Sequence, residues 1–113
     1  MYVITARLVS SQPKARPSDL DRIAGRLREA TECGDSGLQH HWMRPDPLGA
    51  ALVLYMTART LECAELEARV ILFWALASDP SLCRWRLDRA SADLIVSAME
   101  ASLWRQPFDG GLN

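Results

Sequence analysis

The sequence predicts one α+β domain with the order strand, helix, strand, strand, helix, strand, followed by a further helix. Three observations support this. The chain has 113 residues, enough for one hydrophobic core and too few for two. Apolar residues make up 49% and charged residues 24%, as in folded globular proteins. Segments with the two-residue repeat of strands alternate with segments that have the 3.6-residue repeat of helices. We expect the domain to span residues 1–105, and residues 106–113 to form a flexible tail.

The first two elements are a strand and an amphipathic helix. Residues 2–9 are rich in β-branched side chains and predict the first strand. Apolar residues then recur at helical spacing over residues 20–30. Ser18 is positioned to cap the N-terminus of this helix, and Gly34 and Gly37 to end it.

The middle of the chain predicts two strands and a second helix. Residues 38–44 form the second strand, and the almost continuously apolar residues 50–58 form the third. The two prolines and the glycine within residues 45–49 predict a turn between them. Thr60 is expected to cap a helix that runs to about Ser78.

The second half of this helix, residues 70–77, is apolar on every side. A helix of that kind is covered on more than one side. We therefore expect something besides the sheet to pack against it.

The last elements are a strand and a helix. Residues 83–89 alternate strictly, which predicts a strand with Cys83, Trp85 and Leu87 facing inward. Ser91 predicts the start of a last helix, which continues to about residue 104.

This order resembles the ferredoxin-like βαββαβ arrangement, an antiparallel sheet with two helices on one face. The resemblance covers residues 2–89 and is one of pattern. It implies that the first and third strands lie in the middle of the sheet and that the second face carries no helix. A second subunit, the C-terminal helix or a ligand can cover that face. A homodimer is our first expectation, because residues 70–77 also need a neighbour.

The open sheet face supplies the candidates for ligand binding. They are Arg7, His40, His41, Trp42, Tyr55, Arg84 and Arg86. Only one of the adjacent His40 and His41 can face the open side, so the pair cannot converge on one metal ion. A histidine beside Tyr55 or an arginine can act as a general acid or base, and arginines suit a carboxylate or phosphate.

The four tryptophans divide between core and surface roles. Trp74 and Trp85 lie at positions that we expect to face inward. Tryptophan is also enriched at subunit contacts. The interface candidates are Phe73, Trp74 and Trp104.

Composition and missing motifs exclude several classes of function. The net charge of −1 argues against a nucleic-acid partner, and the third strand has aliphatic residues where an RNA-binding sheet would carry aromatic ones. We find no phosphate loop, metalloprotease motif, nucleophile elbow or paired carboxylates, and so expect no metal or cofactor. Three widely separated cysteines without a C-x-x-C pair predict buried free thiols.

The sequence also bears on location and source. No signal peptide is visible, and the longest apolar run, residues 70–77, is too short to span a membrane. We therefore expect a cytoplasmic protein with no membrane partner. A single lysine, Lys14, among many arginines indicates a GC-rich bacterial source.

Two hypotheses for function follow. The first is a small homo-oligomeric module that binds a ligand or a protein and has no evident catalytic constellation. The alternative is a cofactor-free small enzyme of the dimeric α+β-barrel type that acts on an aromatic or acidic metabolite. A cavity of roughly 300 Å³ or more between two sheets would favour the enzyme.

Overall fold

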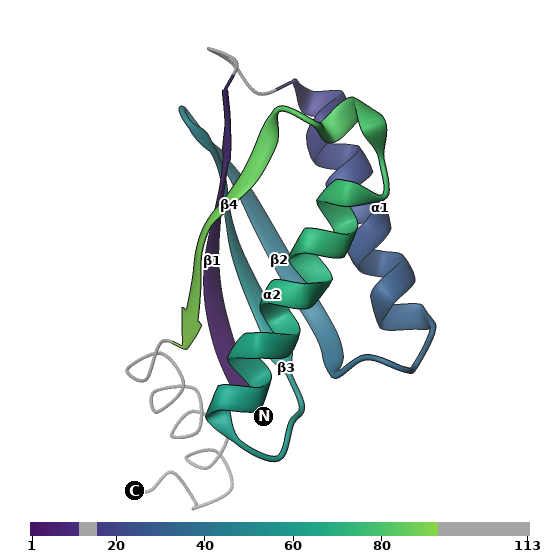
Figure 1. Ribbon diagram of the computed structural model, residues 1–113, viewed down its shortest axis with the longest axis vertical. Helices are drawn as coiled ribbons and strands as arrows, with labels where there is room; N and C mark the ends of the chain where they lie inside the picture. Colours follow the sequence, from purple (N-terminus) through teal and green to yellow (C-terminus); the bar gives the residue numbers. More distant parts are fainter. Residues whose placement is uncertain (12–15, 93–113) are drawn as a thin grey trace, which may run out of the picture.

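The computed structural model describes residues 1–11 and 16–92 (Figure 1). Within these residues it has the α+β architecture, with one four-stranded antiparallel sheet and two α-helices. The elements are β1 (Tyr2–Ser10), α1 (Pro17–Glu32), β2 (Leu38–Asp46), β3 (Gly49–Met56), α2 (Leu61–Ala77), the 3-10 helix η1 (Pro80–Leu82) and β4 (Trp85–Ala92). The predicted last helix, the predicted tail and Trp104 lie outside the described residues.

The strands lie in the order β2-β3-β1-β4, and each pair of neighbours is antiparallel. The prediction that the first and third strands are central is confirmed. Helices α1 and α2 lie against the same face of the sheet, and within the described residues no helix covers the other face (Figure 1). We call that other face the open face.

The core fills the space between the sheet and the helices. Its largest fully buried side chains come from all the layers: Ile4, Leu8, Ile23, Leu27, Leu38, Leu52, Leu54, Met56, Leu72 and Leu82. Trp85 of β4 is buried as predicted, and its indole N–H donates to Asp19 Oδ2 of α1 at 3.2 Å. That bond satisfies the polar end of a buried tryptophan and ties β4 to α1.

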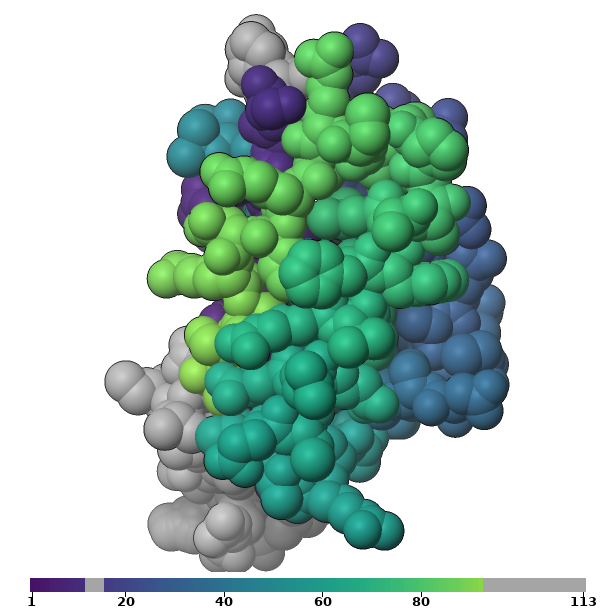
Figure 2. Space-filling view, viewed as in Figure 1, coloured from purple at the N-terminus to yellow at the C-terminus, as the bar shows by residue number. Residues whose placement is uncertain are grey.

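Helix α2 and strand β4 lie side by side on one face of the molecule (Figure 2). Two polar side chains of α2 bond to the backbone of β4. Arg69 donates to the Ala90 carbonyl through Nε at 3.2 Å and Nη2 at 3.0 Å, and Glu65 accepts from the Ala92 N–H at 2.7 Å. These bonds occupy backbone groups of β4, which is an edge strand of the described sheet.

Of the two predicted N-terminal helix caps, one is wrong and one is confirmed. Helix α1 begins at Pro17, after an Arg16 cap that makes no side-chain hydrogen bond, so the predicted cap at Ser18 is wrong. Proline suits the first helical position because its missing N–H would have no partner there. The cap at Thr60 is confirmed, since its Oγ1 accepts from the Cys63 N–H at 3.1 Å.

The connection between β2 and β3 is shorter than predicted. Strand β2 continues through Pro45 to Asp46, and β3 begins at Gly49, so the turn is two residues long rather than five. Asp46 Oδ1 accepts from the N–H groups of Leu48 and Gly49, both at 2.8 Å. Pro45 is tolerated in a strand because β2 lies at the edge of the sheet.

Strand β4 does not keep the predicted strict alternation. Leu87 pairs with Leu8 and Arg89 pairs with Arg7, so Asp88 is an extra residue at a β-bulge. Asp88 and Arg89 are both exposed as a result.

Both predicted boundaries of this region are wrong. Cys83 is the exposed C-terminal cap of η1 and precedes the strand. Ser91 pairs with Thr5 inside β4, so it does not cap a helix.

Candidate functional site

Strand register determines which side chains line the open face, because directly opposed residues of antiparallel neighbours share a face. Leu52 and Leu54 of β3 lie in the core, so the residues between and beyond them, Val53 and Tyr55, point to the open face. His40 of β2 lies opposite Tyr55. Trp42 and Arg44 of β2 share this face, opposite Val53 and Ala51.

The two adjacent histidines lie on opposite faces of the sheet. The His40 ring lies on the open face, with its centroid 5.8 Å from that of Tyr55. His41 lies opposite the core residue Leu54 and is half-buried on the helix side. Burial lowers the pKa of His41, and the nearby positive charges of His40 and Arg28 lower it further. Of the two adjacent histidines, His40 is therefore the one that faces the open side of the sheet.

The open face combines aromatic and cationic side chains. Trp42 is 50% exposed, and Arg44 Cζ lies 5.9 Å from its ring centroid, within cation–π range. Arg7 is paired with Asp46 Oδ2 at 3.2 Å. Arg44 is thus held against an aromatic ring, and its charge is available to an anionic group.

Strand β4 adds two arginines to this face. Arg86 lies opposite Val9 and Arg89 opposite Arg7. Arg84 precedes the strand, where its carbonyl accepts from the Ser11 N–H at 2.9 Å. The structure thus brings five of the seven candidates to the open face: Arg7, His40, Trp42, Tyr55 and Arg86. His41 lies on the opposite face, and Arg84 lies beside Ser11, just before β4 begins.

Sequence reasoning missed Arg44 and Arg89 on the open face. Arg44 stands two residues after Trp42, so the two-residue repeat of a strand was sufficient to find it. Arg89 had no such signal, because the bulge at Asp88 shifts the face on which it lies.

The second candidate surface is the outer side of α2. Four large apolar side chains recur there at helical spacing, and each is between 43% and 61% exposed. We call this set the outer stripe: Leu66, Val70, Phe73 and Trp74. The expectation that Trp74 fills the core is wrong, while both of the described interface candidates, Phe73 and Trp74, lie in the stripe.

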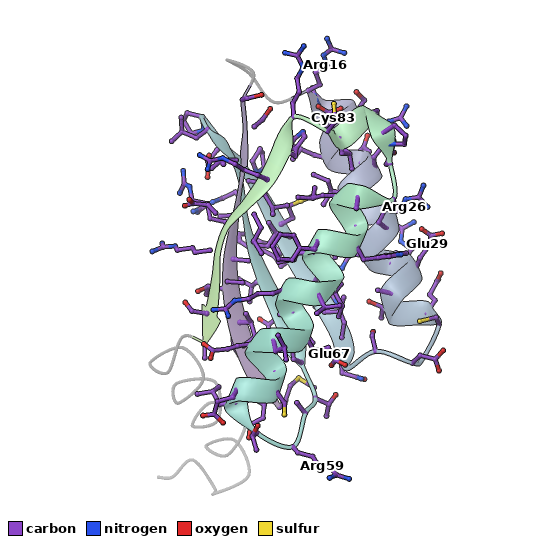
Figure 3. The ribbon with its side chains drawn as sticks, in the orientation of Figure 1. Arg16, Arg26, Glu29, Arg59, Glu67 and Cys83 are labelled. Carbon is purple, nitrogen blue, oxygen red and sulfur yellow. The ribbon has the colours of Figure 1, made fainter. Side chains whose placement is uncertain are left out.

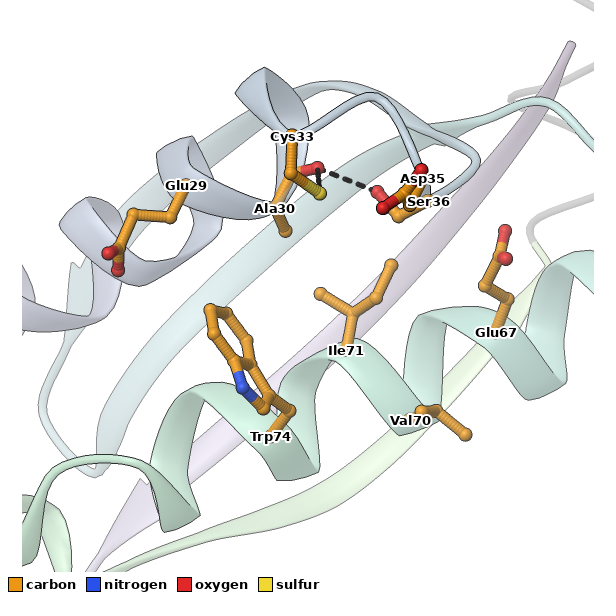
Figure 4. A pocket seen from close by; sticks show the side chains of 9 residues that line it. All are labelled: Glu29, Ala30, Cys33, Asp35, Ser36, Glu67, Val70, Ile71 and Trp74. Atoms are coloured by element: carbon orange, nitrogen blue, oxygen red, sulfur yellow. Dashed lines mark hydrogen bonds between the residues drawn. The ribbon is translucent and has the colours of Figure 1, made fainter.

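A groove lies between the C-terminal end of α1 and the middle of α2 (Figure 4). Its volume is about 420 Å³, within the range of small-molecule sites. The residues that line this α1–α2 groove are Glu29, Ala30, Cys33, Asp35, Ser36, Glu67, Val70, Ile71 and Trp74. They come from two segments that are distant in sequence: residues 29–36, at the end of α1 and in the loop after it, and residues 67–74 of α2.

Hydrogen bonds to one carbonyl fix the loop end of this groove. The Ala30 carbonyl accepts from Ser36 Oγ at 2.8 Å and from Cys33 Sγ at 3.3 Å (Figure 4). On the other side, Glu67 Oε1 accepts from the Gly37 N–H at 2.9 Å. These bonds hold the loop against both helices.

The groove has an acidic rim. Glu29, Asp35 and Glu67 supply three carboxylates, and none of its described lining residues is basic. Glu29 is paired with Arg26 at 2.9 Å on the outer side of α1 (Figure 3). Asp35 and Glu67 therefore leave the rim with a net negative charge.

A smaller hollow beside α1 has a structural role. Its volume is about 280 Å³, and Arg22 and Asp79 meet there at 3.2 Å. Hydrogen bonds from the hydroxyl and N–H of Ser81 lower the pKa of Asp79, and Arg22 lowers it further. The pair joins α1 to the segment between α2 and β4.

The cysteines contradict one expectation. Cys33, Cys63 and Cys83 are all exposed free thiols, because each lies at the end of a helix or in its first turn rather than in the core. Within residues 1–11 and 16–92, no three His, Cys, Asp or Glu side chains gather as metal ligands do. Neither helix in that part of the chain is long and apolar enough to cross a bilayer.

Comparison with known proteins gives no relative. No protein-family model, curated protein or solved structure matches this chain.

Proposed function

We propose that the protein is a small homo-oligomeric binding module. Its subunits associate through the outer stripe of α2, and the open face of the sheet takes a ligand or a partner. The exposed outer stripe is the observation that carries this proposal. The strand order and the placement of both helices on one face support a ferredoxin-like βαββαβ fold as its scaffold.

The outer stripe is suited to pairing with a copy of itself. A two-fold axis brings the same surface of two subunits together, so a helical stripe must complement itself when it runs antiparallel. With Val70 at the centre, Leu66 would lie opposite Phe73 and Trp74 of a second copy. A contiguous apolar surface of this kind is unusual on a monomer.

Light scattering tests the self-association directly. We expect wild-type protein to behave as a dimer, and the variants Val70→Glu and Phe73→Glu to behave as monomers with an unchanged circular dichroism spectrum. Leu48→Glu is the matched control, because Leu48 is 62% exposed in the β2–β3 turn, outside the stripe. A wild-type monomer, or a Leu48→Glu variant that dissociates equally, contradicts the proposal.

A second candidate function rests on the His40–Tyr55 pair. A cofactor-free enzyme of the dimeric α+β-barrel type would use His40 as an acid or base beside Tyr55, with Arg44 binding an aromatic or acidic metabolite. Salicylate is a simple probe of that chemistry. We expect it to shift the amide resonances of residues 40–44 and 51–55, and to do so less in His40→Ala. Shifts confined to other residues would remove this candidate.

The exposed thiols support a cytoplasmic location as part of the proposal. Three unpaired and exposed cysteines suit a reducing compartment, because an oxidising one would drive them into disulfides.

A further inference from the structure

We propose that the α1–α2 groove binds a small amphiphilic cation, a molecule with an apolar body and one ammonium or amidinium group. This site lies on the helix side of the protein and is separate from the open face of the sheet. It shares Val70 and Trp74 with the outer stripe, so its test uses a measurement that does not rely on self-association.

The size and the walls of the groove define the apolar part of this ligand. A volume of about 420 Å³ accommodates a single aromatic ring with a short chain. Ala30 and Ile71 are buried and form the floor, while Val70 and Trp74 form one wall. In Figure 4 the indole of Trp74 points across the groove toward α1.

The rim defines the charge of the ligand. Asp35 and Glu67 face the groove with no basic lining residue to offset them, so the rim favours a cation and disfavours an anion. The bond from the Gly37 N–H fixes the Glu67 carboxylate in place. A carboxylate has about four acceptor sites, so Glu67 keeps capacity for the donors of an ammonium group.

The aromatic wall favours the same charge. A cation near an indole face gains from the ring quadrupole, and tryptophan is the best side chain for this interaction. Apolar walls, an aromatic ring and a carboxylate held by a backbone hydrogen bond are together the features of a site for an organic cation. An uncharged alkyl ligand would make no ion pair with the rim carboxylates.

The groove and the outer stripe share Val70 and Trp74, and the groove extends from them toward α1. Glu67, Ile71 and Trp74 lie on the α1 side of α2, whereas Phe73 and Leu66 face away from the core. Failure of the self-association experiment would leave the groove intact, so the two proposals fail separately.

Two probes with the same apolar body and opposite charge test the inference. They are 4-phenylbutylamine, protonated at pH 7, and 4-phenylbutyrate. Cys33 lines the groove and is exposed, so its alkylation by iodoacetamide reports occupancy. Cys83, exposed and outside the groove lining, is the internal control.

We expect the amine to slow alkylation of Cys33 and to leave Cys83 unchanged. At a concentration of roughly twice Kd, mass action gives a rate about threefold lower. The carboxylate probe should give no protection at the same concentration. Equal protection by both probes, equal effects on both thiols, or no protection at all would overturn the inference.

A charge-removal variant gives the second arm of the test. Asp35→Asn combined with Glu67→Gln removes the two rim carboxylates that have no described ion pair, keeps an acceptor oxygen for the Gly37 N–H, and should weaken amine binding roughly fivefold. Asp88→Asn, an exposed carboxylate on β4, is the matched control and should leave binding unchanged. An equal loss in the control, or no loss in the rim variant, would count against the site.

Discussion

The two helices differ in what they expose, although they cover the same face of the sheet and have similar lengths of 16 and 17 residues. Helix α1 buries Ile23, Leu27 and Ala30, and its outer side carries charged residues such as Arg26 and Glu29. Helix α2 buries a comparable inner side but presents the outer stripe to solvent.

This difference indicates that the inner and outer sides of α2 have different roles. The inner side of α2 already fills its place in the core, with Ala64, Ala68, Leu72 and Ala75 fully buried. The outer stripe is therefore not part of the core that the described residues form. An exposed apolar surface of this kind is a candidate for a contact with something beyond the described residues.

The largest expected effect separates two adjacent residues of α2. Leu72→Ala opens a cavity in the core and should lower the free energy of unfolding by about 2–5 kcal/mol. Phe73→Ala should change the unfolding free energy of the monomer by no more than about 0.5 kcal/mol, as surface substitutions usually do. Urea denaturation at several protein concentrations measures both.

The concentration dependence is informative in this experiment. If the outer stripe joins two subunits, wild-type stability rises with protein concentration and Phe73→Ala removes that rise. A large loss of stability in Phe73→Ala at every concentration would show that the outer side of α2 belongs to the monomer core. The contrast between the two helices would then be wrong.

Gly37, in the loop between α1 and β2, provides the second prediction. A Cβ at Gly37 would collide with the Thr57 carbonyl and with the Glu67 carboxylate, which bonds to the Gly37 N–H. Gly37→Ala should therefore cost about 1–3 kcal/mol, the usual range for overpacking. Thermal denaturation measures the loss.

Gly25 in the middle of α1 is the matched control. A Cβ there meets nothing within 4 Å, so Gly25→Ala should stabilise the protein by about 0.5–1 kcal/mol through helix propensity. If both variants shift in the same direction, the close contact at Gly37 does not hold the loop against α2.

Local pattern predicted the elements because their periodicity reflects burial on one side. The third strand and the second helix came within two residues of their observed bounds, and Thr60 was found from its residue type. Which face of the sheet each side chain occupies was harder to predict, because a β-bulge moves the following side chains to the other face and has no local signal in the sequence. The register shift between Leu38 and His40 and the extra residue at Asp88 decide which side chains reach the open face.

The groove could not have been predicted from local pattern. Its lining comes from residues 29–36 and residues 67–74, which meet only because both helices pack on one side of the sheet. No spacing within either segment indicates a cavity. The outer stripe was visible in sequence as residues 70–77, since excess apolar surface needs no tertiary information to be recognised.

The smallest expected effect concerns His41, on the helix side near Arg28 of α1. Its pKa is lowered below the usual 6.5, first by burial and then by the charges of His40 and Arg28, so the folded state binds a proton less readily than the unfolded state. Stability should thus be full above pH 6.5 and fall as the pH drops toward the lowered pKa. His41→Gln should flatten this part of the stability profile, measured by urea denaturation between pH 5 and 8.

His40→Gln is the control and should keep most of the pH dependence, because burial is the main cause of the lowered pKa and His40 lies on the open face. An unchanged profile in His41→Gln would mean that the side of the sheet facing α1 is not closed around this residue, and that α1 covers its edge of the core less completely than α2 does.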